Sequence, residues 1–376
     1  MARRLCGAEH YPEPLLAVAG YGLPGTTGRF PARPLSDQAW AALMDAALGN
    51  RVVGSLVASL DAGVLPATDQ QAALARRVHR ANVLRMLHLE RELLGVLAVL
   101  AAARVECRVL KGTAVAHLDY PDPALRSFID LDVLVRAEDI DTAAARLTAS
   151  GFTRTLAEPR PGFDRRFDKG MTLIPATGYE LDLHRTFVLG PWGVLMKPEQ
   201  LWDDGEVFHI GDTPVRALSR RYRFLHACFH GALGDWPLRL GSLRDVAEML
   251  PKLTGDGADV RAPAADWGAE AVLAVAVADS VRLLGPRPEG ELARWAAAYR
   301  PSRREERWLD LHNRENKTFT AQALATLGVL RWRDKPAYVR ALAMPDPRYV
   351  ADRHTSVLAR FGYAARQVRK GRGAPC

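Results

Sequence analysis

The stretch that decides the fold is Ser127-Phe-Ile-Asp-Leu-Asp-Val-Leu-Val135. Its apolar and β-branched residues predict a buried strand, because such runs fill the centre of a sheet. Successive side chains of a strand point to opposite faces, so Asp130 and Asp132 are expected to share one face. Two carboxylates placed in this way are typical of a metal-binding pair. The opposite face is expected to be packed by the alternating apolar residues Ile129, Leu131 and Val133.

A strand and a turn are predicted just before this stretch. Residues 105–110 alternate like a strand, Gly112-Thr113 breaks the pattern, and residues 114–118 can form a short helix. The start of a helix offers free N–H groups that favour phosphate, and glycine permits close approach. Thr113 adds a hydroxyl group. The pattern therefore indicates an anion-binding turn beside the carboxylates.

A third carboxylate is expected from a neighbouring strand. Residues 166–174 and 179–183 predict a hairpin, and its second strand contains Glu180-Leu-Asp182-Leu-His184. Glu180, Asp182 and His184 lie on one face of that strand. We choose Asp182 as the third carboxylate, with Glu180 as the alternative. The residue in this position can bind metal and also accept the proton of an attacking hydroxyl.

Outside this middle part, the periodicity predicts helices. The fold class is therefore α+β, with a small mixed-sheet core between helical regions. We predict an N-terminal helical region at 1–104, an α/β core at 105–214 and a C-terminal helical region at 215–376. One long helix is expected to start after Thr68 and to end near residue 103, with Leu74, Leu84 and Leu87 on its apolar face. The other expected helices span residues 36–48, 51–62, 137–150, 219–232, 241–253, 267–284 and 289–298.

These motifs carry a family resemblance. The run Leu110-Lys-Gly-Thr113, then Arg126-x-x-x-Asp130-Leu-Asp132, then Asp182-Leu-His184 resembles the uncharacterised nucleotidyltransferase family of the DNA polymerase β superfamily. The resemblance continues through Leu225-His226-x-x-x-His230 and covers roughly residues 83–250. One departure is Thr113, since the superfamily commonly has Ser after the glycine. The resemblance implies a small nucleotidyltransferase fold flanked by helices.

The resemblance also implies a chemistry for these residues. Asp130, Asp132 and Asp182 would bind Mg²⁺, with Mn²⁺ as the alternative, and a nucleoside triphosphate would be the substrate. Gly112 and Thr113 would contact its phosphates. Phosphate charge could also be neutralised by two cationic residues, Lys111 and Arg126. For both of these, an ordinary surface charge is the competing interpretation.

Composition limits the compartment and the partners. Apolar residues make up 48% and charged residues 25% of the 376 residues, as in soluble globular proteins. The four cysteines form no C-x-x-C pair, and the start MARRLCGAEHYPEP has no signal-peptide run. No membrane association and a cytoplasmic location are therefore expected. The net charge of +8 suits an anionic acceptor, and nucleic acid is not strongly indicated. Part of the charge lies in a basic tail after Tyr349, which we interpret as solvated.

Several motifs remain ambiguous at this level. A second Asp-x-Asp occurs at Asp139 to Asp141 in an expected helix, and a second Leu-Asp-Leu-His ends at His312 among charged residues. We interpret that second copy as a solvated helix face. His226 and His230, one helical turn apart, suit packing better than metal binding. Three residues near them could instead line a nucleotide or acceptor pocket: Trp236, Arg239 and Arg244.

Two functions compete at this level. In the first, an enzyme transfers a nucleoside monophosphate to a hydroxyl or phosphate of a small metabolite, a peptide or protein, or an RNA. In the second, a nucleotidyltransferase fold binds nucleotide or a partner protein without catalysis. A kinase ranks last, because the sequence has neither G-x-G-x-x-G nor a Walker A motif.

Overall fold

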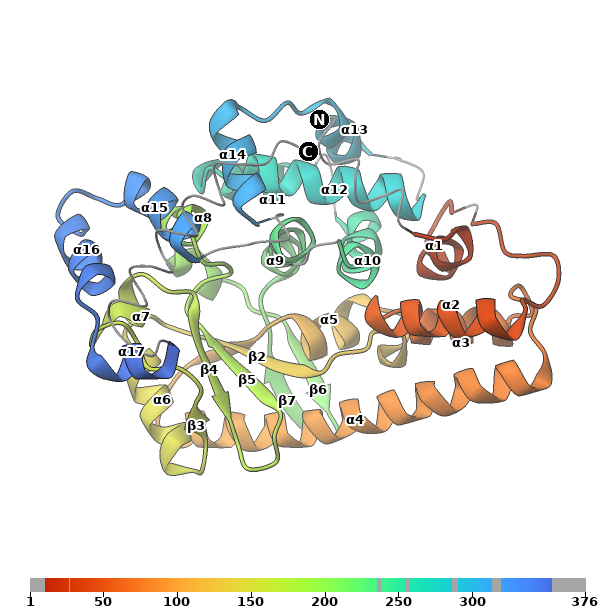
Figure 1. Cartoon of the computed structure of the whole chain (residues 1–376), viewed down its shortest axis with the longest axis horizontal. Coiled ribbons are helices and arrows are strands. Elements are labelled where there is room, and N and C mark those ends of the chain that lie inside the picture. Colours follow the sequence, from red (N-terminus) through yellow and green to blue (C-terminus); the bar gives the residue numbers. More distant parts are fainter. Residues whose placement is uncertain are drawn as a thin grey trace.

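The computed structural model describes residues 11–26, 28–234, 238–253, 257–285, 290–312 and 319–353. Its centre is a five-stranded mixed sheet in the order β1-β2-β5-β4-β3, with helices packed around it (Figure 1). The strands are β1 Cys107–Val109, β2 Asp130–Val135, β3 Thr153–Arg154, β4 Gly170–Ile174 and β5 Glu180–His184. This arrangement confirms the predicted α+β class.

Pairing within the sheet places β2 and β5 side by side in parallel, although β4 lies between them in the sequence. Every other pair is antiparallel, including the predicted β4–β5 hairpin. Among the strands, the sequence analysis missed β3 and a separate hairpin of β6 Val207–Ile210 and β7 Thr213–Arg216. These strands are short and partly exposed, so they carry little apolar periodicity.

The N-terminal part is helical, as predicted. The long helix α4 starts after Thr68, whose hydroxyl accepts a hydrogen bond from the backbone of Gln71 in a capping box. It runs along the lower edge of the molecule in Figure 1, beneath the sheet. The expected apolar face is wrong in part, since Leu84 is 66% exposed and Leu87 is 56% exposed. The N-terminal helices are α1 Glu13–Gly20, α2 Asp37–Gly49, α3 Val53–Asp61 and α4 Asp69–Ala102.

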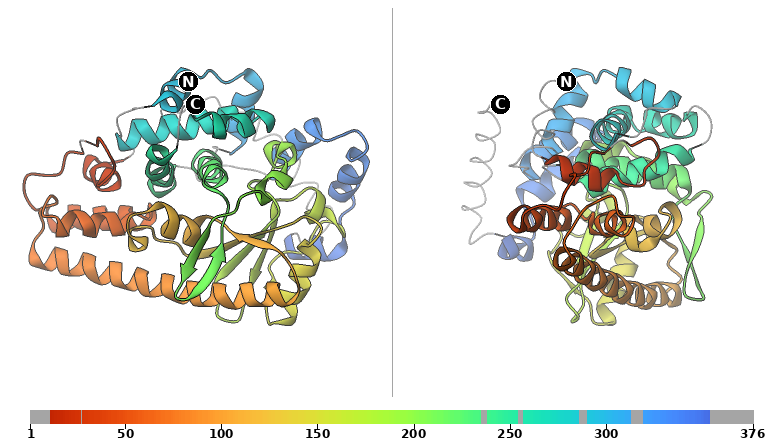
Figure 2. Two further views of the ribbon diagram at one scale, coloured as in Figure 1. Left: turned by 180° about the vertical axis from the view of Figure 1, so that it is seen from behind. Right: turned by 90° about the vertical axis from the view of Figure 1, so that its right-hand side faces the viewer.

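Further helices fill the core region and the C-terminal part. Figure 1 and Figure 2 show helices of the C-terminal part stacked above the sheet, on the side opposite α4, while the last two described helices lie beside the sheet. Those of the core region are α5 Lys111–Asp119, α6 Ile140–Ala149, α7 Phe163–Arg166 and α8 Pro191–Leu195. Those of the C-terminal part are α9 Arg220–Leu233, α10 Leu240–Met249, α11 Ala258–Asp266, α12 Glu270–Leu284, α13 Glu291–Ala298, α14 Arg303–His312, α15 Phe319–Val329, α16 Lys335–Ala343 and α17 Pro347–Arg353.

The hydrophobic core is continuous between regions that are far apart in the sequence. Leu15, Leu43 and Leu56 of the N-terminal helices pack in one cluster with Leu243 of α10 and Leu284 of α12. The division of the chain at residues 104 and 214 stays a prediction. The cluster shows that the first and third of these regions share a hydrophobic core. None of the helices in the described ranges combines the length and the apolar character needed to cross a bilayer.

Three local expectations need correction. The strand predicted from Ser127 begins at Asp130, and Ile129, just before it, is 53% exposed instead of packed. Gly112-Thr113 does not precede the helix but lies in its first turn, because α5 starts at Lys111. Residues 166–169 lie outside β4, which starts at Gly170. In each case the element type is right and its start is displaced, as is common where no cap marks the boundary.

Candidate active site

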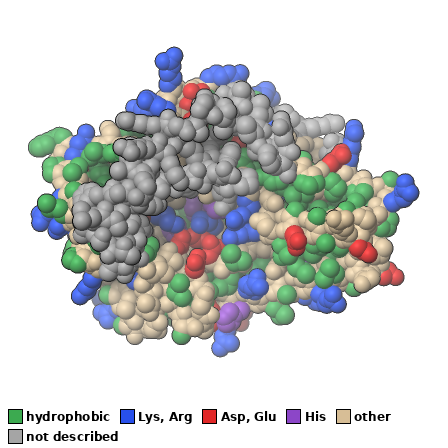
Figure 3. All heavy atoms as spheres, in the orientation of Figure 1, with side chains coloured by type: hydrophobic (Ala, Val, Ile, Leu, Met, Phe, Trp, Pro, Cys, Tyr) green, Lys and Arg blue, Asp and Glu red, His purple; other side chains and the backbone are tan. Residues whose placement is uncertain are grey.

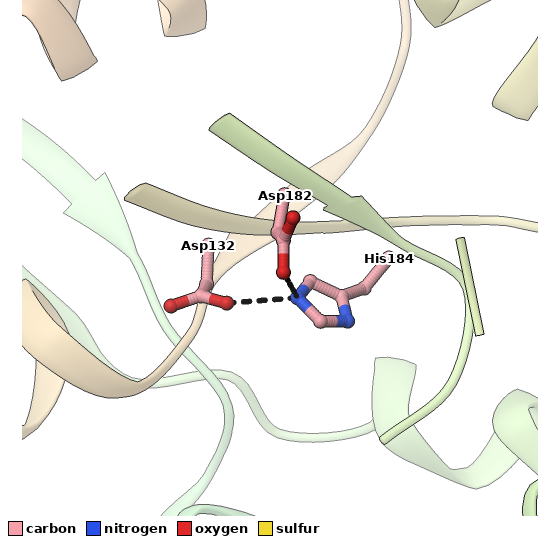
Figure 4. Close-up of side chains that lie close together, drawn as sticks. All are labelled: Asp132, Asp182 and His184. Atoms are coloured by element: carbon pink, nitrogen blue, oxygen red, sulfur yellow. Dashed lines mark hydrogen bonds and ion pairs between the residues drawn. The ribbon is translucent and has the colours of Figure 1, made fainter. Parts of the chain in front are cut away.

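Parallel pairing of β2 and β5 positions the predicted carboxylates. The register sets Asp130 opposite Glu180 and Asp132 opposite Asp182, with His184 one step further along. Because facing residues of paired strands point to the same side of the sheet, the two rows of polar side chains converge. Figure 4 shows Asp132 and Asp182 side by side with His184 beside them.

Three of these side chains form a compact group. Ligand atoms of Asp132, Asp182 and His184 all lie within 4.8 Å of one another. His184 Nε2 is 2.8 Å from Asp132 Oδ1 and 3.8 Å from Asp182 Oδ2. Glu180 is exposed at the start of β5 and does not belong to this group. Of the two alternatives for the third carboxylate, Asp182 is therefore the one that lies beside Asp132.

Asp130 lies at the start of β2, away from this group. Its Oδ1 is 3.8 Å from the guanidinium of Arg51, which lies between α2 and α3. The side chain of Asp130 is more exposed than that of Asp132. The two carboxylates of the Asp-x-Asp pair thus differ in surroundings, although they share a face of one strand.

Two lysines lie against the carboxylates. Lys111 Nζ is 2.6 Å from Asp132 Oδ1, and Lys169 Nζ is 3.0 Å from Asp182 Oδ2. Thr172 of β4 donates a hydrogen bond of 2.5 Å to Asp182 Oδ1. The sequence analysis missed Lys169 and Thr172. The available signal was their place in the predicted strand 166–174, the hairpin partner of Glu180-Leu-Asp182-Leu-His184; in the structure Thr172 lies on β4 and Lys169 just before it.

These contacts fix the charge of the group. Burial alone would raise the pKa of Asp132, but Lys111 and His184 outweigh it and lower that pKa well below its ordinary value. The pKa of Asp182 is also lowered, since His184 and Lys169 outweigh the effect of burial. Burial opposes the charge of Lys111, yet the neighbouring Asp132 and Asp130 raise its pKa. At neutral pH the carboxylates are therefore ionised and the lysine is protonated.

The donor set suits a divalent cation. Asp132 is only 3% exposed, yet its Oδ2 has no hydrogen-bond partner among the described residues. A buried carboxylate oxygen without a partner is costly in a purely structural site. Carboxylate oxygens are the ligands that Mg²⁺ and Mn²⁺ prefer, and imidazole nitrogen is also accepted by Mn²⁺. Asp132, Asp182 and His184 therefore fit a cation.

The predicted anion-binding turn has a further role. Gly112 packs against Phe128, since a Cβ at position 112 would lie 3.1 Å from that side chain. Thr113 is buried in the same turn. Lys111 has a φ of +32°, which is strained for a residue with a side chain. The small size of Gly112 lets α5 lie close to the chain just before β2, and this places Lys111 opposite Asp132.

Arg126 lies in a separate ion cluster. It donates from Nη2 to Asp245 Oδ2 at 2.7 Å and from Nε to Oδ1 at 3.2 Å. The Tyr120 hydroxyl donates to the same Oδ1 at 2.8 Å. Arg244, a candidate for a ligand pocket, is also buried, and it pairs with Glu248 at 2.7 Å. Arg126 thus joins the segment before β2 to α10, and Arg244 also donates to the carbonyl of Ala19 in α1 at 2.7 Å. Trp236 lies outside the described residues.

The second Leu-Asp-Leu-His copy is not a solvated face. His312 is only 1% exposed at the end of α14, so that expectation is wrong. The charged residues around it made α14 look solvated, but its buried side is formed by Trp308, Leu309 and His312. The second Asp-x-Asp lies at the start of α6: Asp139 is the N-cap residue, and Asp141 in the first turn is exposed and pairs with Arg165 at 3.5 Å.

His226 and His230 lie close to the carboxylate group, on α9. His226 is buried and stacks on Phe187 with ring centroids 4.5 Å apart, in agreement with the packing interpretation. Burial and the charge of Lys111 lower the pKa of both histidines well below the ordinary value. Both also line a cavity of about 320 Å³ beside Lys111, Lys169 and His184.

The comparison with protein families agrees with the motifs. A family model described as "Uncharacterised nucleotidyltransferase" matches residues 36–285. No curated protein matches the chain. Among solved structures, the chain is similar to an antigenic nucleotidyltransferase-like protein from Paracoccidioides brasiliensis, at 14% identity and a TM-score of 0.33. That match covers 55% of this chain and 92% of the other.

Proposed function

Because this chain belongs to the uncharacterised nucleotidyltransferase family, we propose that it transfers a nucleoside monophosphate from a nucleoside triphosphate to an acceptor. The acceptor group is a hydroxyl or a phosphate. Magnesium is the proposed cation, with manganese as the alternative. The proposed location is the cytoplasm.

One observation carries the proposal: the pairing of Asp132 with Asp182 across two parallel strands, with a buried oxygen of Asp132 left without a partner. A purely structural ion pair would satisfy that oxygen. In a site that binds a cation together with substrate, this oxygen is left available as a ligand of the cation. The family match and the geometry of the site are separate observations, and both favour the same chemistry.

The reaction is a substitution at the α-phosphorus. An oxygen of the acceptor forms a new bond to the α-phosphorus, the bond between that phosphorus and the bridging oxygen to the β-phosphate breaks, and pyrophosphate leaves. A cation bound by Asp130, Asp132, Asp182 and His184 would neutralise charge at the α-phosphate and acidify the attacking hydroxyl. The proton of a hydroxyl acceptor passes to Asp182, which is ionised, whereas a phosphate acceptor needs no base.

Other residues would bind the substrate. Lys111 and the first turn of α5, with Gly112 and Thr113, are proposed to contact the triphosphate. Arg126 is proposed to support this site through electrostatics and through its contact with Asp245, since its side chain is buried. Asp130 is proposed as the outer ligand, nearest to Arg51.

Pyrophosphate release tests the proposal. The purified full-length chain is incubated with each of the four nucleoside triphosphates, magnesium and candidate acceptors. Asp182→Asn should abolish release of pyrophosphate, because the negative charge of the carboxylate is lost. The fold should be retained, because asparagine has nearly the same shape as aspartate. The matched control is Asp310→Asn in the second Leu-Asp-Leu-His, which lies on α14 outside the site. Full release by Asp182→Asn, or equal loss in both variants, would refute the assignment.

A binding module without catalysis is the second candidate. The two lysines that neutralise the carboxylates favour it, because Lys111–Asp132 and Lys169–Asp182 pairs leave the site stable without a cation. Calorimetric titration with nucleoside triphosphates, with and without magnesium, tests this candidate. Nucleotide binding that is independent of magnesium, with no pyrophosphate release for any acceptor, would support it over the enzyme.

A further inference from the structure

A cavity of about 320 Å³ adjoins the carboxylate group on the side of His184. It lies where the end of β5 meets α9, α14 and α15, and Lys111, Lys169 and His184 form the part nearest the carboxylates. In Figure 3, acidic, basic and histidine side chains gather in a hollow near the middle of one face. The volume is that of a site for a small ligand.

Two cationic side chains of the cavity lining can donate to an anion, although each also pairs with a carboxylate of the adjacent group. Their ammonium groups reach the cavity from different elements, Lys111 at the start of α5 and Lys169 just before β4. Among the described residues that line it, none is Asp or Glu, and histidines supply most of the remaining polar groups. A phosphate group has several terminal oxygens, so it can accept hydrogen bonds from both ammonium groups at the same time.

The far wall of the cavity comes from helices beyond the family match, which ends at residue 285. His312 of α14 and Gln322 of α15 both line it, and both are buried. The amide Nε2 of Gln322 lies 3.4 Å from His312 Nδ1. Gly190 approaches the same imidazole closely, since a Cβ there would be 3.4 Å from His312 Nε2. These contacts fix the position of a polar wall formed by α14 and α15.

We infer that this cavity binds a phosphate-bearing ligand, with its phosphate between Lys111 and Lys169 and its uncharged part against His312 and Gln322. The inference rests on the proposed function, in which either the nucleoside triphosphate or a phosphorylated acceptor supplies that phosphate. The lysines give affinity, and the pair on α14 and α15 selects the ligand. Substrate choice then depends on a part of the chain outside the family match.

Binding of inorganic pyrophosphate to the full-length chain tests the phosphate end. Lys169→Gln should weaken binding about tenfold or more, since a charge-assisted hydrogen bond is lost. The control is Lys197→Gln, an exposed lysine paired with Asp266 away from the cavity, which should bind as the unmodified chain does. No pyrophosphate binding by the unmodified chain, or equal affinities in the two variants, would overturn the inference.

The far wall is tested with His312→Asn and Gln322→Leu, and His88→Asn on the exposed side of α4 is the control. If the ligand is the nucleotide, both wall variants weaken binding of a non-hydrolysable nucleoside triphosphate. If it is a phosphorylated acceptor, they leave that binding unchanged and weaken binding of phenyl phosphate to the chain saturated with the analogue. Unchanged affinity for both probes would overturn the role of the wall.

The two proposals can fail separately. Pyrophosphate binding that depends on Lys169, without pyrophosphate release from any nucleotide, would retain the cavity and reject the proposed enzyme. Release that depends on Asp182, with cavity variants that bind every probe normally, would retain the enzyme and reject the cavity.

Discussion

Asp132 and Asp245 are both buried and both have cationic partners, but they differ in one respect. Asp245 of α10 has both carboxylate oxygens bonded, since Arg126 contacts both and Tyr120 donates to Oδ1. Asp132 of β2 has Lys111 and His184 on Oδ1, while Oδ2 has no partner within the described part of the chain. The first cluster is closed and the second is open.

The difference separates a structural carboxylate from a functional one. A closed cluster compensates the cost of burial within the protein and joins elements distant in sequence. In the open cluster the lysine compensates the charge, but one oxygen of Asp132 has no partner among the described residues and can bind a ligand. Asp132 and Asp245 should therefore respond in opposite ways to the same substitution, and four predictions test this contrast.

The largest effect is expected from the two asparagine variants. Asp132→Asn should reduce nucleotidyl transfer at least about a thousandfold, roughly 4 kcal/mol, because a cation ligand is lost. Its fold should be retained, as judged by far-ultraviolet circular dichroism. Asp245→Asn should instead lower the free energy of unfolding and keep activity in the molecules that remain folded. If the two variants lose activity equally, the contrast between closed and open clusters is wrong.

Removal of the arginine side chain from the closed cluster should give the next largest effect. Arg126→Ala leaves Asp245 charged and buried, so the free energy of unfolding should fall by about 3–5 kcal/mol. Urea denaturation measures it. Arg76→Ala breaks an ion pair of the same 2.7 Å length with Asp61, but on the surface. That control should change stability by less than about 1 kcal/mol. Equal losses would show that burial is not the cause.

Acid should lower the free energy of unfolding through two buried histidines that lie near Asp132. His226 and His230 line a small hollow with Lys111 and Asp245, and burial, followed by the charge of Lys111, lowers their pKa values. The unfolded chain binds protons below about pH 6.5, while the folded chain does not. The free energy of unfolding should thus be highest above that pH and fall below it, by up to about 1.4 kcal/mol per pH unit for each histidine.

Urea unfolding across this pH range measures the slope. His226→Gln should reduce it by the share of one histidine, because glutamine does not titrate. His88→Gln, on an exposed part of α4, is the matched control for the substitution itself. A slope that is identical in all three proteins would contradict the account of buried neutral imidazoles.

The smallest effect concerns Thr172. Thr172→Val removes the hydrogen bond to Asp182 and nearly preserves side-chain volume. We expect a loss of about 1 kcal/mol, seen as a modest fall in turnover rather than its abolition. The measurement is pyrophosphate release against nucleotide concentration. Thr155→Val, which loses an exposed bond to a backbone carbonyl, is the control and should keep full turnover.

The sequence predicted the core of the fold because its signals are local. Thr68 marks the start of α4 with a cap, and the alternation around Asp132 marks β2. The parallel register of β2 and β5 is not a local property, so the sequence alone could not place Asp182 opposite Asp132. That pairing depends on how β4 and β5 fold back against β2.

The two Leu-Asp-Leu-His copies show the remaining limit. In β5, alternate side chains point to the same face of the strand, so Asp182 and His184 both lie beside Asp132. In α14 the same letters follow the helical period, and His312 is buried while Asp310 is not. Burial of His312 depends on Trp192 and on α15, which come from other parts of the chain. Lys169 was missed because its contact with Asp182 also depends on the pairing of two strands, β4 and β5.

The β2–β5 ladder also restricts how the length of this chain can change during evolution. A residue inserted inside either strand would turn every later side chain to the opposite face and exchange Asp132 or Asp182 for a leucine. The turn at residues 175–179 lies outside the ladder, so extra residues there would leave both strands in place. Insertions are therefore expected to accumulate in that turn and to be eliminated by selection from the two strands.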